Sequence, residues 1–189
     1  MVRFLLIEPG ATELDDQGRM KGSMDMPLSE SGRDQVLQAV EQLSEYRLDR
    51  IYCAPCQSAR QTAETLHRWC GGRVKVVDCL KNIDHGLWSG KKIEEVRTQL
   101  PRIYRTGQEH PDQICPPGGE TVDQARNRVS KMIAKIQRKY RKGTVALVVP
   151  DPLAGVVRSL LVGDSMGNLW KHEADEAVWE IIESAPAGV

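Results

Sequence analysis

The fold is decided by the stretch Arg3-Phe4-Leu5-Leu6-Ile7-Glu8-Pro9-Gly10, in which an unbroken apolar run ends in an acid, a proline and a glycine. A run of this length predicts a strand buried on both faces, and the residues that end it predict a loop at its carboxyl end. Residues 8–28 show no clear period, which favours a long loop. Open α/β sheets place their ligand sites at such strand ends.

The rest of the chain repeats this strand-and-helix pattern. Further short apolar runs predict strands at 51–53, 74–77, 145–149 and 178–182. Helical spacing of apolar residues predicts helices around 36–43, 57–69, 93–100, 122–136 and 156–161, and Thr121 with Gln124 has the spacing of a capping box. We therefore expect an α/β fold, a three-layer α/β/α sandwich with a mostly parallel central sheet, in a single domain over residues 1–189.

Composition narrows the class of protein. The 26 basic residues balance the 26 acidic residues, and no apolar run approaches the roughly 20 residues of a spanning helix. We interpret the basic residues on and just after the predicted 122–136 helix as a solvated face, so that neither nucleic acid nor a membrane is an expected partner. These residues are Arg126, Arg128, Lys131, Lys135, Arg138 and Lys139. Five cysteines, an odd number, favour free thiols in a reducing compartment, and we expect the cytoplasm.

Four blocks in a fixed order resemble the histidine phosphatase superfamily, whose members are phosphoglycerate-mutase-like. The blocks are Gly18–Gln35 with its Asp25-Met26-Pro27-Leu28-Ser29 core, Ala59–Ala63, Gly86-Leu87-Trp88-Ser89-Gly90, and Pro117-Gly118-Gly119-Glu120-Thr121. Together they cover nearly the whole chain. The resemblance implies a phosphoryl-transfer site with a nucleophilic histidine, a second histidine, two arginines that hold the phosphate, and a carboxyl proton donor.

The first of these positions departs from the family pattern. Where the family has Arg-His-Gly after the first strand, this chain has Glu8-Pro9-Gly10. Pro9 has no side-chain nitrogen that could attack phosphorus, and Glu8 puts an anion where a cation is expected.

The remaining positions depart as well. Ser58 aligns with the second arginine, Asn82 with the proton donor, and Asp151 with the second histidine, the last in an uncertain register. Asp15 takes the place of an asparagine that commonly touches phosphate. Because each charge-assisted hydrogen bond contributes roughly 1.5–3 kcal/mol, we expect phosphate stabilisation to be largely lost.

Other residues could restore part of this chemistry. Arg19, Lys91 and Lys92 could supply positive charge, and His85 could act as a relocated nucleophile, although a packing role is the simpler interpretation. The candidate pocket therefore comprises Glu8, Pro9, Gly10, Asp15, Arg19, Ser58, Asn82, His85 and Asp151.

Two further features were weighed for metal or redox chemistry. Cys53 and Cys56 have the spacing of a redox or zinc pair but lack a second pair, so Cys53 is expected in a buried strand and Cys56 at the pocket edge. Glu8, Asp15 and Asp151 could together bind a hard cation, but solvation or pairing with basic residues is the preferred interpretation. We predict no metal and no cofactor.

Three functional hypotheses follow. The leading one is a non-catalytic member of the superfamily that binds an unknown small ligand or protein partner. The second is an enzyme of altered chemistry with an acidic, metal-binding pocket. The third is a phosphatase or phosphoglycerate mutase with a rearranged site.

Overall fold

The structure is a computed structural model that describes residues 2–170 and 178–184. In chain order its elements are β1 (Val2–Ile7), α1 (Glu13–Asp16), α2 (Glu30–Gln42), β2 (Arg50–Cys53), α3 (Gln57–Cys70), β3 (Arg73–Val76), α4 (Ile93–Gln99), α5 (Pro101–Glu109), α6 (Val122–Lys139), β4 (Gly143–Val148), α7 (Leu153–Val162) and β5 (Trp179–Ser184). Single 3₁₀ turns lie at Asp78–Leu80, Gly86–Trp88 and Pro111–Gln113.

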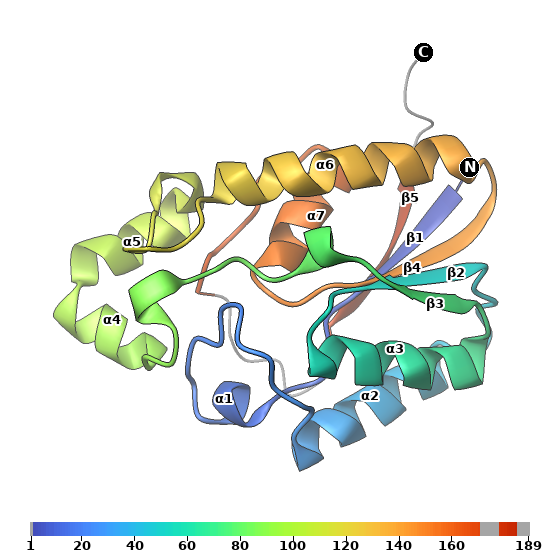
Figure 1. Cartoon of the computed structure of the whole chain (residues 1–189), viewed down its shortest axis with the longest axis horizontal. Helices are drawn as coiled ribbons and strands as arrows, with labels where there is room; N and C mark the ends of the chain where they lie inside the picture. The colour runs from blue at the N-terminus through green and yellow to red at the C-terminus, as the bar shows by residue number, and fades with distance from the viewer. Residues whose placement is uncertain (1, 171–177, 185–189) are drawn as a thin grey trace.

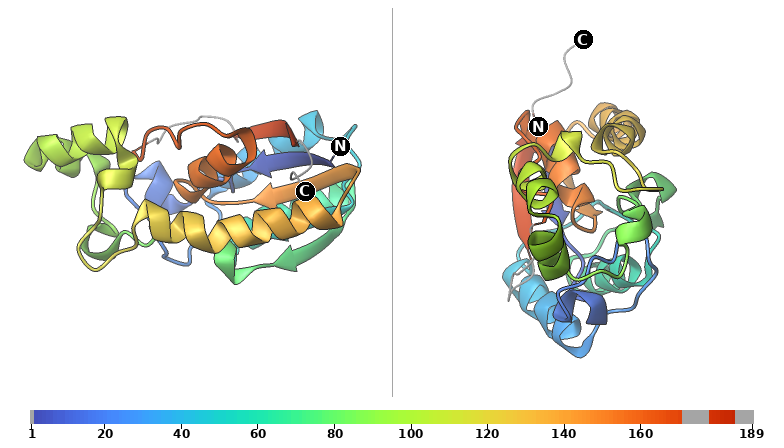
Figure 2. Two further views of the ribbon diagram at one scale, coloured as in Figure 1. Left: turned by 90° about the horizontal axis from the view of Figure 1, so that it is seen from above. Right: turned by 90° about the vertical axis from the view of Figure 1, so that its left-hand side faces the viewer.

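Five strands form one sheet in the order β3-β2-β4-β1-β5. The first four are parallel neighbours, and β5 runs antiparallel to β1 at the edge. Helices α2 and α3 cover one face of the sheet, and α6 and α7 cover the other (Figures 1 and 2). The expected three-layer α/β/α sandwich with a mostly parallel sheet is confirmed.

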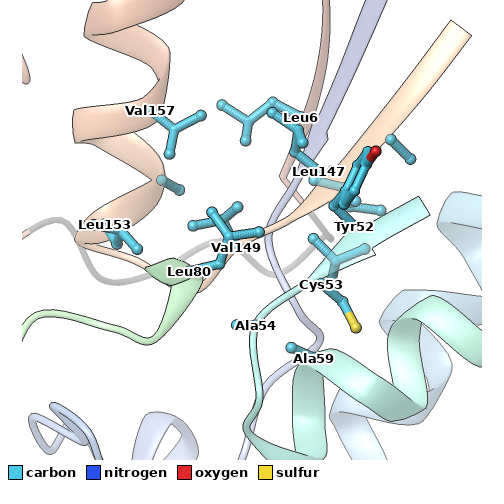
Figure 3. Close-up of a cluster of buried hydrophobic side chains, with 14 of the residues drawn as sticks. Leu6, Tyr52, Cys53, Ala54, Ala59, Leu80, Leu147, Val149, Leu153 and Val157 are labelled. Carbon is cyan, nitrogen blue, oxygen red and sulfur yellow. The ribbon is translucent and has the colours of Figure 1, made fainter. Parts of the chain in front are cut away.

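The core explains why the strands read as apolar runs. In β4, five consecutive residues from Thr144 are buried, because helices pack on both faces of this central strand. Figure 3 shows Leu6 and Leu147 from the sheet close to Val157 of α7. Burial of this apolar area stabilises the layers at roughly 25 cal/mol per Å².

Helix boundaries follow local signals where such signals exist. Thr121 and Gln124 form the predicted capping box at the start of α6. Helices α1 and α5 were not predicted. Helix α1 lies inside the expected 8–28 loop, and the apolar residues of α5 gave no clear period. Gly107 in α5 lacks a side chain where the Trp170 indole packs against it, so this helix depends on a tertiary contact.

Strand topology fixes where a site can form. The last residues of β1, β4 and β2 are register partners, Ile7 with Val148 and Val148 with Cys53. The three parallel strands therefore end side by side, at the carboxyl end of the sheet. No helix within the described ranges is both long and apolar enough to cross a membrane.

Candidate functional site

A cavity of about 210 Å³ opens at the carboxyl end of the sheet, beyond the ends of β2 and β4. Its wall comes from the loop after α1, the start of α3, the segment after the first 3₁₀ turn, and the end of β4. The lining residues are Lys21, Gly22, Ser23, Met24, Asp25, Pro55, Cys56, Ser58, Lys81, Asn82 and Pro150. Two of them carry an ammonium group, and Cys56, Ser23 and Ser58 carry a thiol or a hydroxyl.

Lys21 is held in place by Asp15. Its Nζ donates to Asp15 Oδ2 at 2.7 Å, and the two side chains are only 14% and 20% exposed. The same oxygen accepts from the Thr12 backbone N–H and the Thr12 hydroxyl, both at 2.8 Å, which completes a capping box on α1. One carboxylate thus fixes both the start of α1 and a cation on the cavity wall.

The charge of Asp15 is compensated rather than repulsive. Burial alone would raise the pKa of Asp15, but Lys21 and the hydrogen bonds from Thr12 outweigh it, and the net shift of the pKa is downward. Asp15 therefore stays ionised as the partner of Lys21. The preferred interpretation, that this acid is solvated or paired with a basic residue, agrees with the structure, although the partner is Lys21 and not Arg19, Lys91 or Lys92.

This pairing predicts how stability depends on pH. A lowered pKa means that the stabilisation is complete above the ordinary value of 3.8 and is lost as the pH falls through the lower folded-state value. We expect Asp15→Asn to have a lower melting temperature than wild type at pH 6, and the gap to narrow by pH 3. Thermal unfolding of both proteins across this range measures it. A gap that stays constant with pH would contradict the assignment.

Asn82 joins three segments at the cavity. Its amide Nδ2 donates to the Gly22 carbonyl at 3.1 Å and to the Asp151 carbonyl at 2.7 Å. Its Oδ1 accepts from the backbone N–H groups of Ile83 and Leu153. Asn82 therefore fastens the wall together, a role that its alignment with a proton donor did not predict.

The start of α3 brings a thiol and a hydroxyl together. Cys56 is the N-cap residue, and its Sγ lies 3.6 Å from Ser58 Oγ. The Gln57 N–H donates to Asp25 Oδ1 at 2.7 Å, so a carboxylate already caps this helix. Cys53 is buried in β2, and burial is the main cause that raises its pKa to about 11. The expected division between a buried Cys53 and a pocket-edge Cys56 agrees with the structure.

The structure brings only part of the predicted pocket together. Ser58 and Asn82 line the cavity, and the Asp151 carbonyl is bonded to Asn82. Glu8 is placed at the end of β1, where its N–H donates to the Val178 carbonyl. Arg19 points elsewhere, since its guanidinium donates to the Gly90 carbonyl at 2.7 Å and to Gln17.

The Pro9-Gly10 turn packs against α2. Gly10 lies so close to the Gly32 carbonyl that a side chain at position 10 would collide with it. Its N–H donates to the Thr62 hydroxyl. Pro9 is half-buried and is not among the lining residues of the cavity.

His85 is a packed side chain in this conformation. It is 5% exposed, and neither ring nitrogen has a hydrogen-bond partner in the part of the chain that the structure describes. It lies against Gly22, since a Cβ built at Gly22 would be 3.3 Å from His85 Cβ. Burial lowers its pKa to about 4, with Asp84 opposing the shift, so the ring is neutral near pH 7. His85 is not among the lining residues of the cavity.

The metal hypothesis receives no support from the geometry. Across residues 2–170 and 178–184, no group of three or more His, Cys, Asp or Glu side chains could hold a metal ion. Asp15, one of the three acids considered, is engaged by Lys21.

Sequence reasoning missed the two cations of the wall. Arg19, Lys91 and Lys92 were considered as compensating charges, but Lys21 and Lys81 line the cavity instead. A signal was present: each lysine directly precedes a residue of the wall, Gly22 or Asn82, in a stretch aligned with the family.

Comparisons with known proteins agree with the fold. The family model described as "Histidine phosphatase superfamily (branch 1)" matches residues 4–189. Phosphoserine phosphatase 1 of Hydrogenobacter thermophilus is 29% identical over 182 residues, 96% of this chain and 86% of that protein. A mycobacterial glucosyl-3-phosphoglycerate phosphatase superposes with a TM-score of 0.81 at 23% identity, covering 95% of this chain and 88% of that one. A phosphoglycerate mutase of Bacillus anthracis gives a TM-score of 0.81 at 19% identity, covering 98% and 92%.

The chain belongs to the histidine phosphatase superfamily. The leading hypothesis of a non-catalytic member is wrong, because a relative that matches 96% of this chain is named as a phosphatase. The physical reason for the error is that the hypothesis looked for positive charge only at the family's aligned positions and at Arg19, Lys91 and Lys92. Lys21 and Lys81 supply positive charge from other positions on the wall.

Proposed function

We propose that this protein is a phosphatase with a rearranged site, which hydrolyses a small phosphate monoester in the cavity beyond β2 and β4. The observation that carries the proposal is the pair of ammonium groups, Lys21 and Lys81, on the wall of that cavity. Membership of the superfamily and the name of the Hydrogenobacter relative support it. The volume of about 210 Å³ favours a small phosphorylated metabolite over a large one.

The two lysines have a definite task in this reaction. Negative charge shifts onto the oxygens of the phosphoryl group and the leaving alcohol as the ester P–O bond breaks, and fixed cations stabilise that charge. Lys21 is pre-oriented by Asp15, whereas the side chain of Lys81 is exposed. The ester oxygen leaves as an alcohol with a proton from water, and the water oxygen ends in inorganic phosphate.

The attacking group differs from the family's histidine. Pro9 has no side-chain nitrogen that could attack phosphorus, and His85 is packed against Gly22. The wall itself carries the Cys56 thiol and the hydroxyls of Ser23 and Ser58, and water can attack directly. Single substitutions Cys56→Ala, Ser23→Ala and Ser58→Ala, assayed for turnover, separate these routes.

The test is turnover of phosphate monoesters by the purified protein. We expect hydrolysis of at least one substrate among p-nitrophenyl phosphate, phosphoserine, phosphoglycerates and glucosyl-3-phosphoglycerate. Lys81→Met should lower kcat/KM about 10- to 100-fold, because a charge-assisted contact contributes roughly 1.5–3 kcal/mol and each 1.4 kcal/mol is tenfold.

The matched control is Lys75→Met, which removes an exposed lysine on strand β3. This variant should retain the wild-type kcat/KM. A wild-type rate no higher than that of a Lys21→Met/Lys81→Met double variant would refute the proposal.

Two broader expectations stay predictions. The prediction that the protein resides in the cytoplasm rests on the odd number of cysteines. A single domain over residues 1–189 includes residues 171–177 and 185–189, which lie outside the described residues.

A further inference from the structure

Arg128 of α6 makes four hydrogen bonds from a half-buried position. Its Nε and Nη2 donate to the two carboxylate oxygens of Glu120 at 2.6 and 2.8 Å. Its Nη1 donates to the Cys79 carbonyl, and Nη2 also donates to the Asn82 carbonyl at 3.2 Å. The side chains of Arg128 and Glu120 are only 18% and 15% exposed, so this pair is shielded from solvent.

The two carbonyls belong to one short segment, residues 78–83, which carries both Lys81 and Asn82 to the cavity. Beyond the 3₁₀ turn Asp78–Leu80 this segment has no regular ladder of hydrogen bonds. The carbonyls of residues 79 and 82 bracket Lys81 in the chain. Holding both of them restricts where the Lys81 backbone can lie.

Glu120 links the same guanidinium to the other side of the segment. Its backbone N–H donates to the Asp84 carbonyl at 2.8 Å, two residues beyond Asn82. Asn82 in turn binds the carbonyls of Gly22 and Asp151. The Arg128–Glu120 pair therefore lies outside the cavity and holds the backbone around Asn82, the residue whose amide joins three segments at the wall.

We infer that Arg128 is a positioning residue of the phosphatase site, which fixes Lys81 and Asn82 on the cavity wall through the carbonyls of Cys79 and Asn82. The inference rests on the proposed function. Arginine suits this role because its planar fork serves a carboxylate and two carbonyls at once, which a lysine ammonium cannot do.

The experiment compares Arg128→Lys with a matched control, Arg126→Lys, on the same helix. Arg126 instead donates to the Ser159 hydroxyl of α7 at 3.3 Å. Within the described residues, it makes no hydrogen bond to segment 78–83. Both variants keep their charge. We expect Arg128→Lys to lower kcat/KM about tenfold and to speed amide hydrogen exchange at residues 79–84, with Arg126→Lys unchanged in both.

A double-mutant cycle separates positioning from general destabilisation. If Arg128 acts through Lys81, then Lys81→Met combined with Arg128→Lys should lose little more activity than Lys81→Met alone, within about twofold. Independent, multiplicative losses in an active protein would overturn the inference, as would unchanged exchange at residues 79–84. A wild-type protein without turnover would refute the proposed function and this inference with it, whereas an active wild type matched by Arg128→Lys would refute the inference alone.

Discussion

Replacing Asn82 by alanine is expected to lower the free energy of unfolding by about 3–5 kcal/mol, because each buried partner left unsatisfied costs roughly 1–3 kcal/mol and the losses overlap. The variant leaves four backbone groups without the amide: the carbonyls of Gly22 and Asp151, and the N–H groups of Ile83 and Leu153. With a shift of roughly 2–4 °C per kcal/mol at this chain length, the melting temperature should fall by on the order of 10 °C. Thermal and urea unfolding measure both quantities.

The control variant changes Lys81, the residue directly before Asn82 in the chain. Lys81→Ala changes an exposed side chain on the same wall and should alter the free energy of unfolding by no more than about 0.5 kcal/mol. Asn82→Asp adds a second comparison, because a carboxylate cannot donate to the two carbonyls and should destabilise the fold at neutral pH. A loss under about 1 kcal/mol in Asn82→Ala would show that the three segments do not depend on this amide.

The fold was predictable because its signals are local. A central strand covered on both faces needs consecutive apolar residues, and β1 and β4 have them within a residue or two of the predicted bounds. Helix α6 carries its own capping box at Thr121. Helix α5 had no comparable signal, because what stabilises it includes the contact of Gly107 with the distant Trp170.

The site was less predictable because its charges are set by contacts between segments. Pairing of Asp15 with a basic residue was expected, but Lys21 was not among the partners considered, because only the loop after α1 brings its ammonium back onto Asp15. Arg128 was assigned to a solvated helix face. Periodicity predicts which side of α6 a side chain lies on. It cannot show that segment 78–83 packs against that side and that two of its carbonyls accept hydrogen bonds from Arg128.

The same limit explains the error about catalysis. Alignment placed Pro9, which has no nucleophilic side chain, at the position of the family's histidine. It could not show that Lys21 and Lys81 meet beyond the ends of β2 and β4, because the two lysines come from separate segments of the chain. Loss of the family residues at the aligned positions is therefore weak support for loss of function when the cavity itself persists.

Lys21→Met should have the largest effect on activity, a fall in kcat/KM of roughly 100-fold or more, since it removes a cation worth roughly 1.5–3 kcal/mol and also leaves the Asp15 carboxylate without its ammonium partner beside the cavity. The unpaired carboxylate then repels the phosphate. Initial rates and the inhibition constant of inorganic phosphate measure the two consequences.

Asp15→Asn is the variant that distinguishes charge from shape. The amide can still accept from Thr12 to keep the cap on α1, but it no longer neutralises Lys21, so inorganic phosphate should inhibit this variant up to about tenfold more tightly than wild type, on the scale of one charge-assisted contact. Combining it with Lys21→Met should recover about tenfold of the activity that Lys21→Met loses, because the repulsive carboxylate is gone. Equal activity of Lys21→Met and the double variant would mean that the Asp15 carboxylate exerts no electrostatic effect on the bound phosphate, and would contradict this prediction.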